Sequence, residues 1–409
     1  MSDIGNKWIW PWGEIGRLTR RMRVNETGRF SDGRNWADFL VEWATGETLM
    51  WGNRELSIRK SNDYRTLSKY STLEVGSWDR PVEMRPWKTL EDYIAELKRP
   101  QPPKPAPPEL RYVNYAMGGC IVTMDWTFPP KFGALSYLRG QVEDYILQRR
   151  EMGTQFGGPT LHVVWIGLND FVTVLRPDYD PAKTQNLPAT DDYAAWRTWS
   201  QNNPGQLTGG VGVFPAVAEI QSLVELINSS FTDGEGRGDH HFMVVDLPSV
   251  YNAIRYMEGL AEPNMIEEAR KIEPVTRRYN AMLASLVQHW PDGPNAPLPN
   301  NVQLVQMSRW MNSISANLPT WHLEREPQDR GVPVHYEISM PPGAKDPVPS
   351  NMRRRITTSD LGHPTEAVYH LIARYFVSEM LKRHTLGRLD AATWTKNKPF
   401  PDLPDEPQG

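Results

Sequence analysis

The sequence has little cysteine: Cys120 is the single one among 409 residues. One thiol excludes an intrachain disulfide and any metal site built from cysteine ligands. Long apolar runs are also lacking, since no stretch approaches the roughly 18 residues that a membrane-spanning helix needs. We therefore expect no transmembrane segment. A lone cysteine suits a secreted as well as a cytoplasmic protein, so the localisation stays open.

An excess of either charge is lacking as well. The chain has 45 Lys and Arg residues against 49 Asp and Glu residues, which gives a net charge of −4. Proteins that bind nucleic acids or anionic membrane surfaces need a concentrated basic face. The one local basic run, at residues 353–355, is interpreted as a solvated approach to a strand. The charge pattern therefore predicts no nucleic-acid partner.

Proline and tryptophan, by contrast, are abundant, with 36 and 16 residues respectively. Proline indicates stiffened loops, and tryptophan indicates large buried surfaces. Two stretches are predicted to be large insertions: residues 45–109, which end in a proline-rich strap, and residues 176–215, which suit a long loop. We expect one domain over residues 1–390 and a proline-rich tail over residues 391–409.

The remaining residues alternate between apolar runs that suit strands and stretches with helical periodicity. The expected strands are 110–116, 161–166, 242–247 and 302–307. The expected helices are 36–43, 134–149, 216–230, 264–289 and 364–383. Apolar strands that alternate with helices are typical of a parallel sheet covered on both faces. The sequence therefore predicts an α/β fold: a three-layer α/β/α sandwich, flavodoxin-like, with a mostly parallel sheet and two large insertions.

Polar motifs follow the ends of these runs, where ligands bind in open α/β sheets. Gly118-Gly119 lets backbone N–H groups approach a ligand closely, because glycine has no Cβ. Asn169 offers a side-chain amide after the next strand, and together these groups are a candidate oxyanion hole. Asp360 and His363 lie just before the last helix, where the carboxylate can orient the imidazole as a base.

Five short sequence motifs stand out along the chain. They are 28–36 (GRFSDGRNW), 114–119 (NYAMGG), 167–170 (GLND), 244–248 (VVDLP) and 360–365 (DLGHPT). In this order they resemble motifs of the SGNH hydrolases, also called GDSL lipases or esterases. One segment alone is a weak signal, whereas five in the right order are specific. The resemblance touches most of the chain outside the two insertions.

The resemblance implies a serine ester hydrolase of the lipase, esterase or acetylesterase type. In such an enzyme His363 is the general base, Asp360 orients it, and Gly119 and Asn169 form the oxyanion hole. The implied substrate is a small-molecule, lipid or carbohydrate ester, and neither a cofactor nor a metal is required. Two alternatives are an inactive binding protein with the same fold and an acyltransferase that uses the same site.

The attacking serine is where the chain departs from the family pattern. The family's first block reads Gly-Asp-Ser-x-Ser-Asp-x-Gly-Asn, and the chain opens with MSDIGN. This alignment places the Gly-Asp-Ser triplet, and any signal peptide, before Met1. Three hypotheses account for the difference: a sequence that begins inside the motif, a pseudoenzyme without the nucleophile, and a shift of the attacking role to Ser2.

Structural interpretations compete with these functional ones. The two expected oxyanion segments also suit plain turns at strand ends, and Asp360 also suits a helix cap. Cys120, a lone cysteine after a strand, is predicted to be a small buried hydrophobe. Asp239-His240-His241 is predicted to be a loop-edge pair and not a metal site, because adjacent residues on a strand point to opposite faces.

Overall fold

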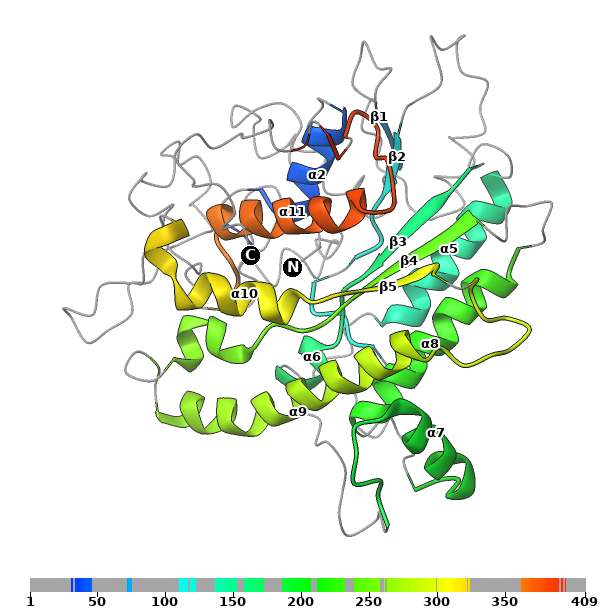
Figure 1. Cartoon of the computed structure of the whole chain (residues 1–409), viewed down its shortest axis with the longest axis vertical. Helices are drawn as coiled ribbons and strands as arrows, with labels where there is room; N and C mark the ends of the chain where they lie inside the picture. Colours follow the sequence, from blue (N-terminus) through cyan, green and yellow to red (C-terminus); the bar gives the residue numbers. More distant parts are fainter. Residues whose placement is uncertain are drawn as a thin grey trace, which may run out of the picture. The chain divides into compact units, whose positions relative to one another are not determined.

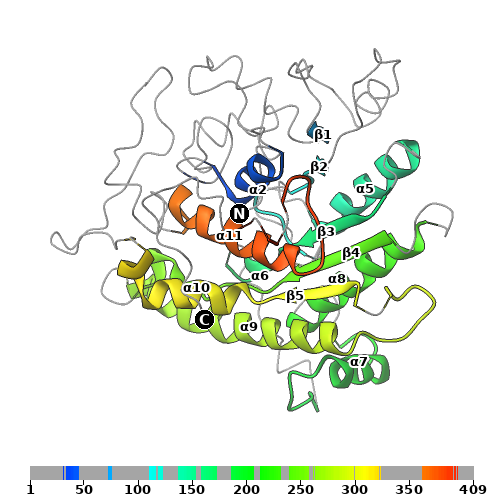
Figure 2. The ribbon, with the colours of Figure 1, turned by 45° about the horizontal axis from the view of Figure 1, so that its top comes forward.

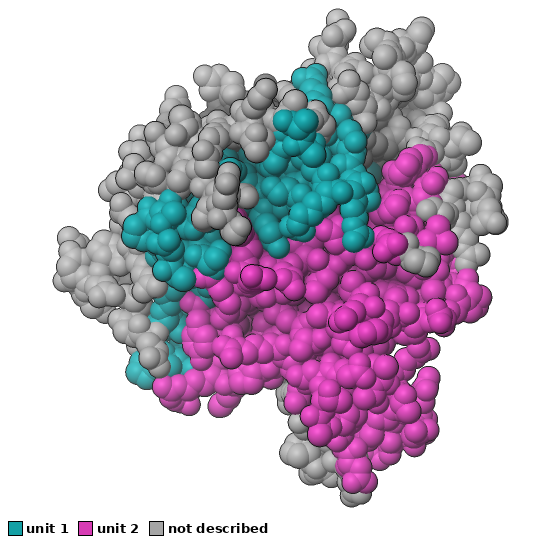
Figure 3. Space-filling model, viewed as in Figure 1, with its two compact units in different colours: residues 1–118, 252–266, 313–409 teal, residues 119–251, 267–312 magenta. Residues whose placement is uncertain are grey.

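The computed structural model of the chain describes residues 31, 34–45, 72–75, 110–116, 118–122, 137–152, 158–172, 186–206, 212–231, 239–257, 261, 263–298, 300–321, 323, 362–389, 391–392 and 394. Its α-helices in these ranges are α2 (Trp36–Thr45), α5 (Leu138–Met152), α6 (Leu168–Val172), α7 (Tyr193–Asn202), α8 (Val213–Ser229), α9 (Pro263–Gln288), α10 (Met307–Ala316) and α11 (Glu366–Leu381). The strands are β1 (Thr72–Val75), β2 (Leu110–Val113), β3 (Thr160–Val164), β4 (His240–Val245) and β5 (Val302–Val305), and short 3₁₀ helices are η4 (Val250–Asn252), η5 (Ile254–Tyr256) and η6 (Leu318–Trp321). The chain divides into two compact units (Figure 3): unit 1 holds residues 1–118, 252–266 and 313–409, and unit 2 holds residues 119–251 and 267–312.

Unit 2 contains a parallel sheet in the order β3-β4-β5 (Figure 1). Its central strand reads HHFMVV and is buried along almost its whole length, as a continuous apolar run favours. The connection from β3 to β4 contains α6, α7 and α8, and the connection from β4 to β5 contains α9. This alternation confirms the predicted α/β class. The strands expected at 161–166, 242–247 and 302–307 are present, with starts within two residues of the predicted ones.

The structure corrects the prediction of a long loop over residues 176–215. Helix α7 lies in this range, and Asp192 caps its N-terminus by accepting a backbone N–H at 3.1 Å. Tyr193, Trp196 and Trp199 are buried, and the helix packs on α8. The stretch as a whole is polar and rich in proline and glycine, and this conceals the short helix in the sequence.

Unit 1 contains an antiparallel pair of strands, β1 and β2. Thr72 lies opposite Val113, and Val75 lies opposite Leu110. The prediction that residues 110–116 belong to the parallel sheet is therefore wrong in the described part of the chain. The partner strand, β1, comes from the stretch predicted as the first insertion, and a short apolar run does not identify its own partner.

Helices α2 and α11 lie side by side in unit 1 (Figures 1 and 2). The Trp36 ring lies 4.6 Å from the Phe376 ring, measured between centroids, and the Phe39 ring lies 5.3 Å from the His370 ring. All four side chains are buried. Burial of an aromatic side chain contributes roughly 1.5–3 kcal/mol, so α11 is anchored along its length.

The longest of the described helices, α9, has 26 residues and carries charged residues between Glu267 and Arg278. None of the described helices combines the length and the apolar character that a bilayer crossing requires.

Candidate functional site

The first expected oxyanion segment is a turn at Gly118-Gly119. Gly119 has a φ of 78°, in the left-handed region that favours glycine. Cys120 follows directly and is buried, and its Sγ accepts a hydrogen bond from Gln141 Nε2 at 2.9 Å. The prediction that Cys120 is buried is therefore confirmed.

Asn169 lies on α6, the short helix that follows β3. Its Nδ2 donates a hydrogen bond to the Cys120 carbonyl oxygen at 3.0 Å. A side-chain amide carries two N–H donors, so one of the two is engaged with the turn next to Gly119. This bond links Asn169 to the residue that follows Gly119, within unit 2. That they act as an oxyanion hole stays a prediction.

Asp170 makes a second link between the same parts of the chain, a role that the sequence did not indicate. Its Oδ2 accepts a hydrogen bond from the Val122 N–H at 2.9 Å, and the residue is 1% exposed. Asn169 thus donates to the turn, and Asp170 accepts from it. The Gly-x-Asn-Asp motif is therefore a two-point clamp on residues 120–122.

We expect Asp170→Ala to lower the free energy of unfolding by about 1–3 kcal/mol, because it leaves the buried Val122 N–H without this acceptor. Asp170→Asn keeps an acceptor oxygen and is the matched control, so its loss is expected to be smaller. Urea unfolding of the full chain, followed by circular dichroism, measures both losses. Equal losses in the two variants would contradict the clamp.

The glycine of the same motif is required by its backbone and by its neighbours. Gly167 has a φ of 120°, and a Cβ at this position would lie 3.0 Å from Tyr279 Cζ. The Tyr279 hydroxyl donates a hydrogen bond to the Ile166 carbonyl oxygen at 3.0 Å. Burial raises the pKa of Tyr279 well above its ordinary value of 10, which keeps this donor protonated. Helix α9, which carries Tyr279, thus fixes the backbone that leads from β3 into α6.

Asp246 follows β4 and caps α10. Its carboxylate accepts hydrogen bonds from the Ser308 N–H at 2.6 Å and from Ser308 Oγ at 2.5 Å. The first N–H groups of a helix need such acceptors. Burial raises the pKa of Asp246 to about 6. The aspartate of the VVDLP segment therefore joins β4 to α10.

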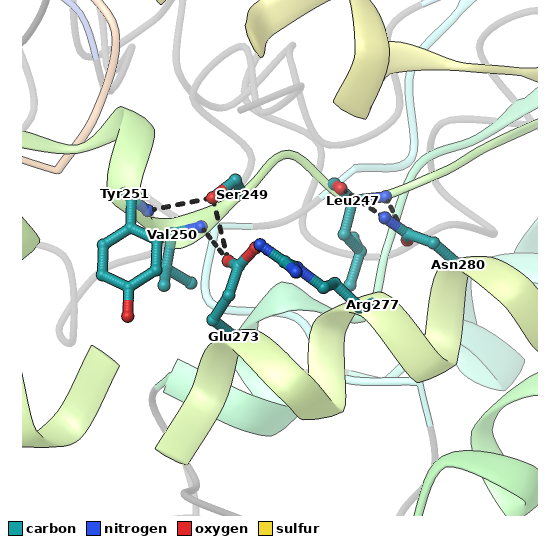
Figure 4. A network of polar contacts seen from close by, with 7 residues as sticks. All are labelled: Leu247, Ser249, Val250, Tyr251, Glu273, Arg277 and Asn280. Carbon is teal, nitrogen blue, oxygen red and sulfur yellow. Dashed lines mark hydrogen bonds and ion pairs between the residues drawn. The ribbon is translucent and has the colours of Figure 1, made fainter. Parts of the chain in front are cut away.

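The segment after β4 is held by α9 (Figure 4). Glu273 accepts a hydrogen bond from the Val250 N–H at 3.1 Å and pairs with Arg277 at 2.9 Å. Asn280 bonds both the N–H and the carbonyl oxygen of Leu247, each at 2.8 Å. This network fixes the loop at the carboxyl end of β4, the edge at which α/β sheets bind ligands.

His363 is partly buried, three residues before α11 in unit 1. Thr365 is the N-cap of that helix, and its side chain accepts a hydrogen bond from the Val368 N–H. Glu366, in the first turn, pairs with Arg34 Nε at 2.7 Å, and its side chain is 7% exposed. The helix start that follows His363 is thus tied to the segment before α2.

The described residues bring together part of the predicted constellation. Gly119 and Asn169 meet in unit 2 through the Cys120 carbonyl, and His363 belongs to unit 1. Asp360 and Ser2 lie outside the described residues. The catalytic roles of these residues stay predictions.

The Asp239-His240-His241 segment differs from its prediction as a loop-edge pair. Both histidines lie on β4, His240 is 1% exposed, and its Nδ1 lies 3.0 Å from Nε2 of His162 on β3. Aromatic packing accounts for this burial, since the Phe231 ring stacks on His240 at 5.0 Å. Within the described ranges, no group of three or more His, Cys, Asp or Glu side chains is placed to hold a metal ion.

No protein-family model matches the chain, and no curated protein matches it in sequence. The functional conclusion therefore rests on the site and on the motifs of the sequence.

Proposed function

We propose that the chain supplies the general base and the oxyanion hole of a serine ester hydrolase of the SGNH, or GDSL, type, on a flavodoxin-like three-layer domain over residues 1–390. The observation that carries the proposal is the hydrogen bond from Asn169 Nδ2 to the Cys120 carbonyl oxygen. It joins the Gly-x-Asn-Asp motif to the Gly-Gly turn. An oxyanion hole built from the Gly119 N–H and the Asn169 amide needs that proximity.

In the proposed reaction, a serine hydroxyl attacks the ester carbonyl carbon while His363 accepts the hydroxyl proton. Asp360 orients the imidazole and stabilises the imidazolium. The oxyanion of the tetrahedral intermediate accepts hydrogen bonds from Gly119 N–H and the Asn169 amide, each worth roughly 3–4 kcal/mol. His363 then gives the proton to the leaving alcohol. A water molecule, activated by the same imidazole, hydrolyses the acyl-enzyme.

Two forms of the protein test the proposal. One is the 409-residue chain, and the other, called the Gly-Asp-Ser form, carries these three residues directly before Met1. We expect the Gly-Asp-Ser form to hydrolyse p-nitrophenyl acetate and to be labelled by a fluorophosphonate at the added serine. The 409-residue chain is expected to do neither. Mass spectrometry of the labelled peptide identifies the reacting residue.

Each alternative predicts a different outcome of this experiment. Labelling of Ser2 in the 409-residue chain would assign the attack to that residue. No turnover and no labelling in either form would contradict the hydrolase proposal and favour a binding protein. Acetyl transfer to an added alcohol in preference to water would identify an acyltransferase.

A further inference from the structure

The Gly119 N–H, one of the two proposed oxyanion donors, lies in a turn without side chains. Gly119 has a φ of 78° and follows a second glycine, Gly118. Glycine adopts positive and negative φ angles about equally readily, so the pair cannot fix the direction of this N–H by itself. That direction depends on how residues 120–122 are held. Asn169 and Asp170 of α6 hold them through the two hydrogen bonds described above.

The start of α5 holds the same residues from a second element, also in unit 2. Tyr137, directly before the helix, forms a parallel β-bridge with Ile121. The Leu138 N–H donates a hydrogen bond to the Ile121 carbonyl oxygen at 3.0 Å. Leu138 is the first residue of α5, and an N–H at this position has no partner inside its own helix. The hydrogen bond therefore satisfies the helix end and fixes the backbone at residue 121.

Gln141, in the first turn of α5, contacts the residue that directly follows Gly119. Its Nε2 donates a hydrogen bond to Cys120 Sγ at 2.9 Å. The thiol in turn donates to the Ile121 carbonyl oxygen, with Sγ at 3.5 Å. The carbonyl oxygen of Cys120 accepts the bond from Asn169. The side chain of Cys120 is thus held by α5, and its main chain is held by α6.

We infer that Gln141 is a positioning residue for the Gly119 N–H. It acts through Cys120 and does not touch the ester. The inference rests on the proposed function in treating Gly119 as an oxyanion donor. Removal of a whole oxyanion donor lowers kcat roughly 100- to 1,000-fold, and a donor that is kept but held less firmly costs less, about tenfold. Because the oxyanion forms only after the substrate has bound, the loss falls on kcat and not on KM.

The single thiol of the chain provides a test that does not need catalysis. Cys120 is 6% exposed and is the only cysteine, so labelling of the native 409-residue chain by N-ethylmaleimide reports on this turn alone. Gln141→Met keeps an unbranched side chain and removes the donor. We expect it to raise the labelling rate about fivefold, because a buried thiol reacts only when its surroundings open. In the Gly-Asp-Ser form, kcat for p-nitrophenyl acetate is expected to fall about tenfold, with KM within about twofold.

Glu143→Met is the matched control, because Glu143 is an exposed residue of the same helix. Its labelling rate and kcat are expected to stay within about twofold of the parent. Cys120→Ala removes the sulfur that Gln141 contacts. In that background, Gln141→Met is expected to lower kcat by less than about twofold, because its partner is already gone.

Several results would overturn the inference. One is a labelling rate or a kcat of Gln141→Met within about twofold of the parent, and another is an equal effect of Glu143→Met. Losses of kcat that add in the variant carrying both Gln141→Met and Cys120→Ala would also overturn it. If the Gly-Asp-Ser form hydrolyses no ester, the proposed function fails, and the labelling rate alone decides whether Gln141 holds the turn.

Discussion

Replacing His363 by alanine in the Gly-Asp-Ser form is expected to lower kcat about 1,000-fold, with little change in KM. A serine hydroxyl is a weak nucleophile unless a base accepts its proton, and a positioned base contributes roughly 10²–10⁴-fold to the rate. The side chain at position 363 makes no other contribution to the proposed reaction. Substrate binding is therefore expected to persist. Steady-state kinetics with p-nitrophenyl acetate measures both constants.

His370, on α11, the helix that follows His363, supplies the control. It is buried, and its ring lies 5.3 Å from that of Phe39 and 5.4 Å from that of Trp43. Burial lowers its pKa to about 3, so the imidazole is neutral and serves as packing. His370→Phe keeps an aromatic ring of similar volume, and kcat is expected to stay within about twofold of the parent.

The two variants separate loss of a base from disturbance of α11. An equal loss of kcat in His370→Phe and His363→Ala would mean that α11 packing explains the effect. Full turnover in His363→Ala would remove this residue from the role of base. A large loss in His363→Ala alone is the result that supports the proposed mechanism.

Local sequence patterns predicted the elements of the fold better than their partners. The apolar stripe of α8 and the apolar run of β4 are carried by residues close together in the chain, so both were predicted within a few residues. The partner of β2 was not predicted, because strand pairing depends on residues far away in the sequence. Helix α7 was missed because its ten residues lie in a stretch that is otherwise polar and rich in proline and glycine.

The residues of the candidate site likewise fall into those that the sequence indicates and those that only the folded structure identifies. Asn169 could be singled out, because a side-chain amide after a strand end is visible in the sequence. The role of Asp170 depends on Val122, which is 48 residues away. No spacing along the chain indicates such contacts, so only the folded structure can assign them.

A pair of neighbouring histidines, of which His240 is buried and His162 is half-buried, makes unit 2 sensitive to acid. Nε2 of His162 lies 3.0 Å from Nδ1 of His240, so one nitrogen donates to the other and the accepting ring is neutral. His240 Nε2 is buried and has no hydrogen-bond partner among the described residues. The nearby charges of Arg149 and His241 also oppose protonation of His240, and Asp239 favours it. A proton on this pair would therefore place a charge among aromatic rings.

We expect the free energy of unfolding to fall as the pH drops from about 6.5 towards 4. An imidazole in the unfolded chain has a pKa near 6.5. Burial lowers the pKa of His240 to about 4 and that of His162 well below 6.5. In this window the unfolded chain takes up protons that the folded chain does not, so acid favours unfolding. His240 alone accounts for about 2 kcal/mol between about pH 7 and pH 4.5, and His162 adds to this loss.

Asp246 opposes this effect, and the experiment has to separate the two. Its pKa of about 6 lies above the ordinary 3.8, so it favours the folded chain as the pH falls through this window. The double variant His162→Phe, His240→Phe keeps Asp246 and replaces both members of the pair by apolar rings of similar shape. Urea unfolding at about pH 7 and pH 4.5 is expected to show that the parent loses at least about 2 kcal/mol more than the double variant. Parallel pH profiles would contradict this account, because the two proteins differ only in the pair.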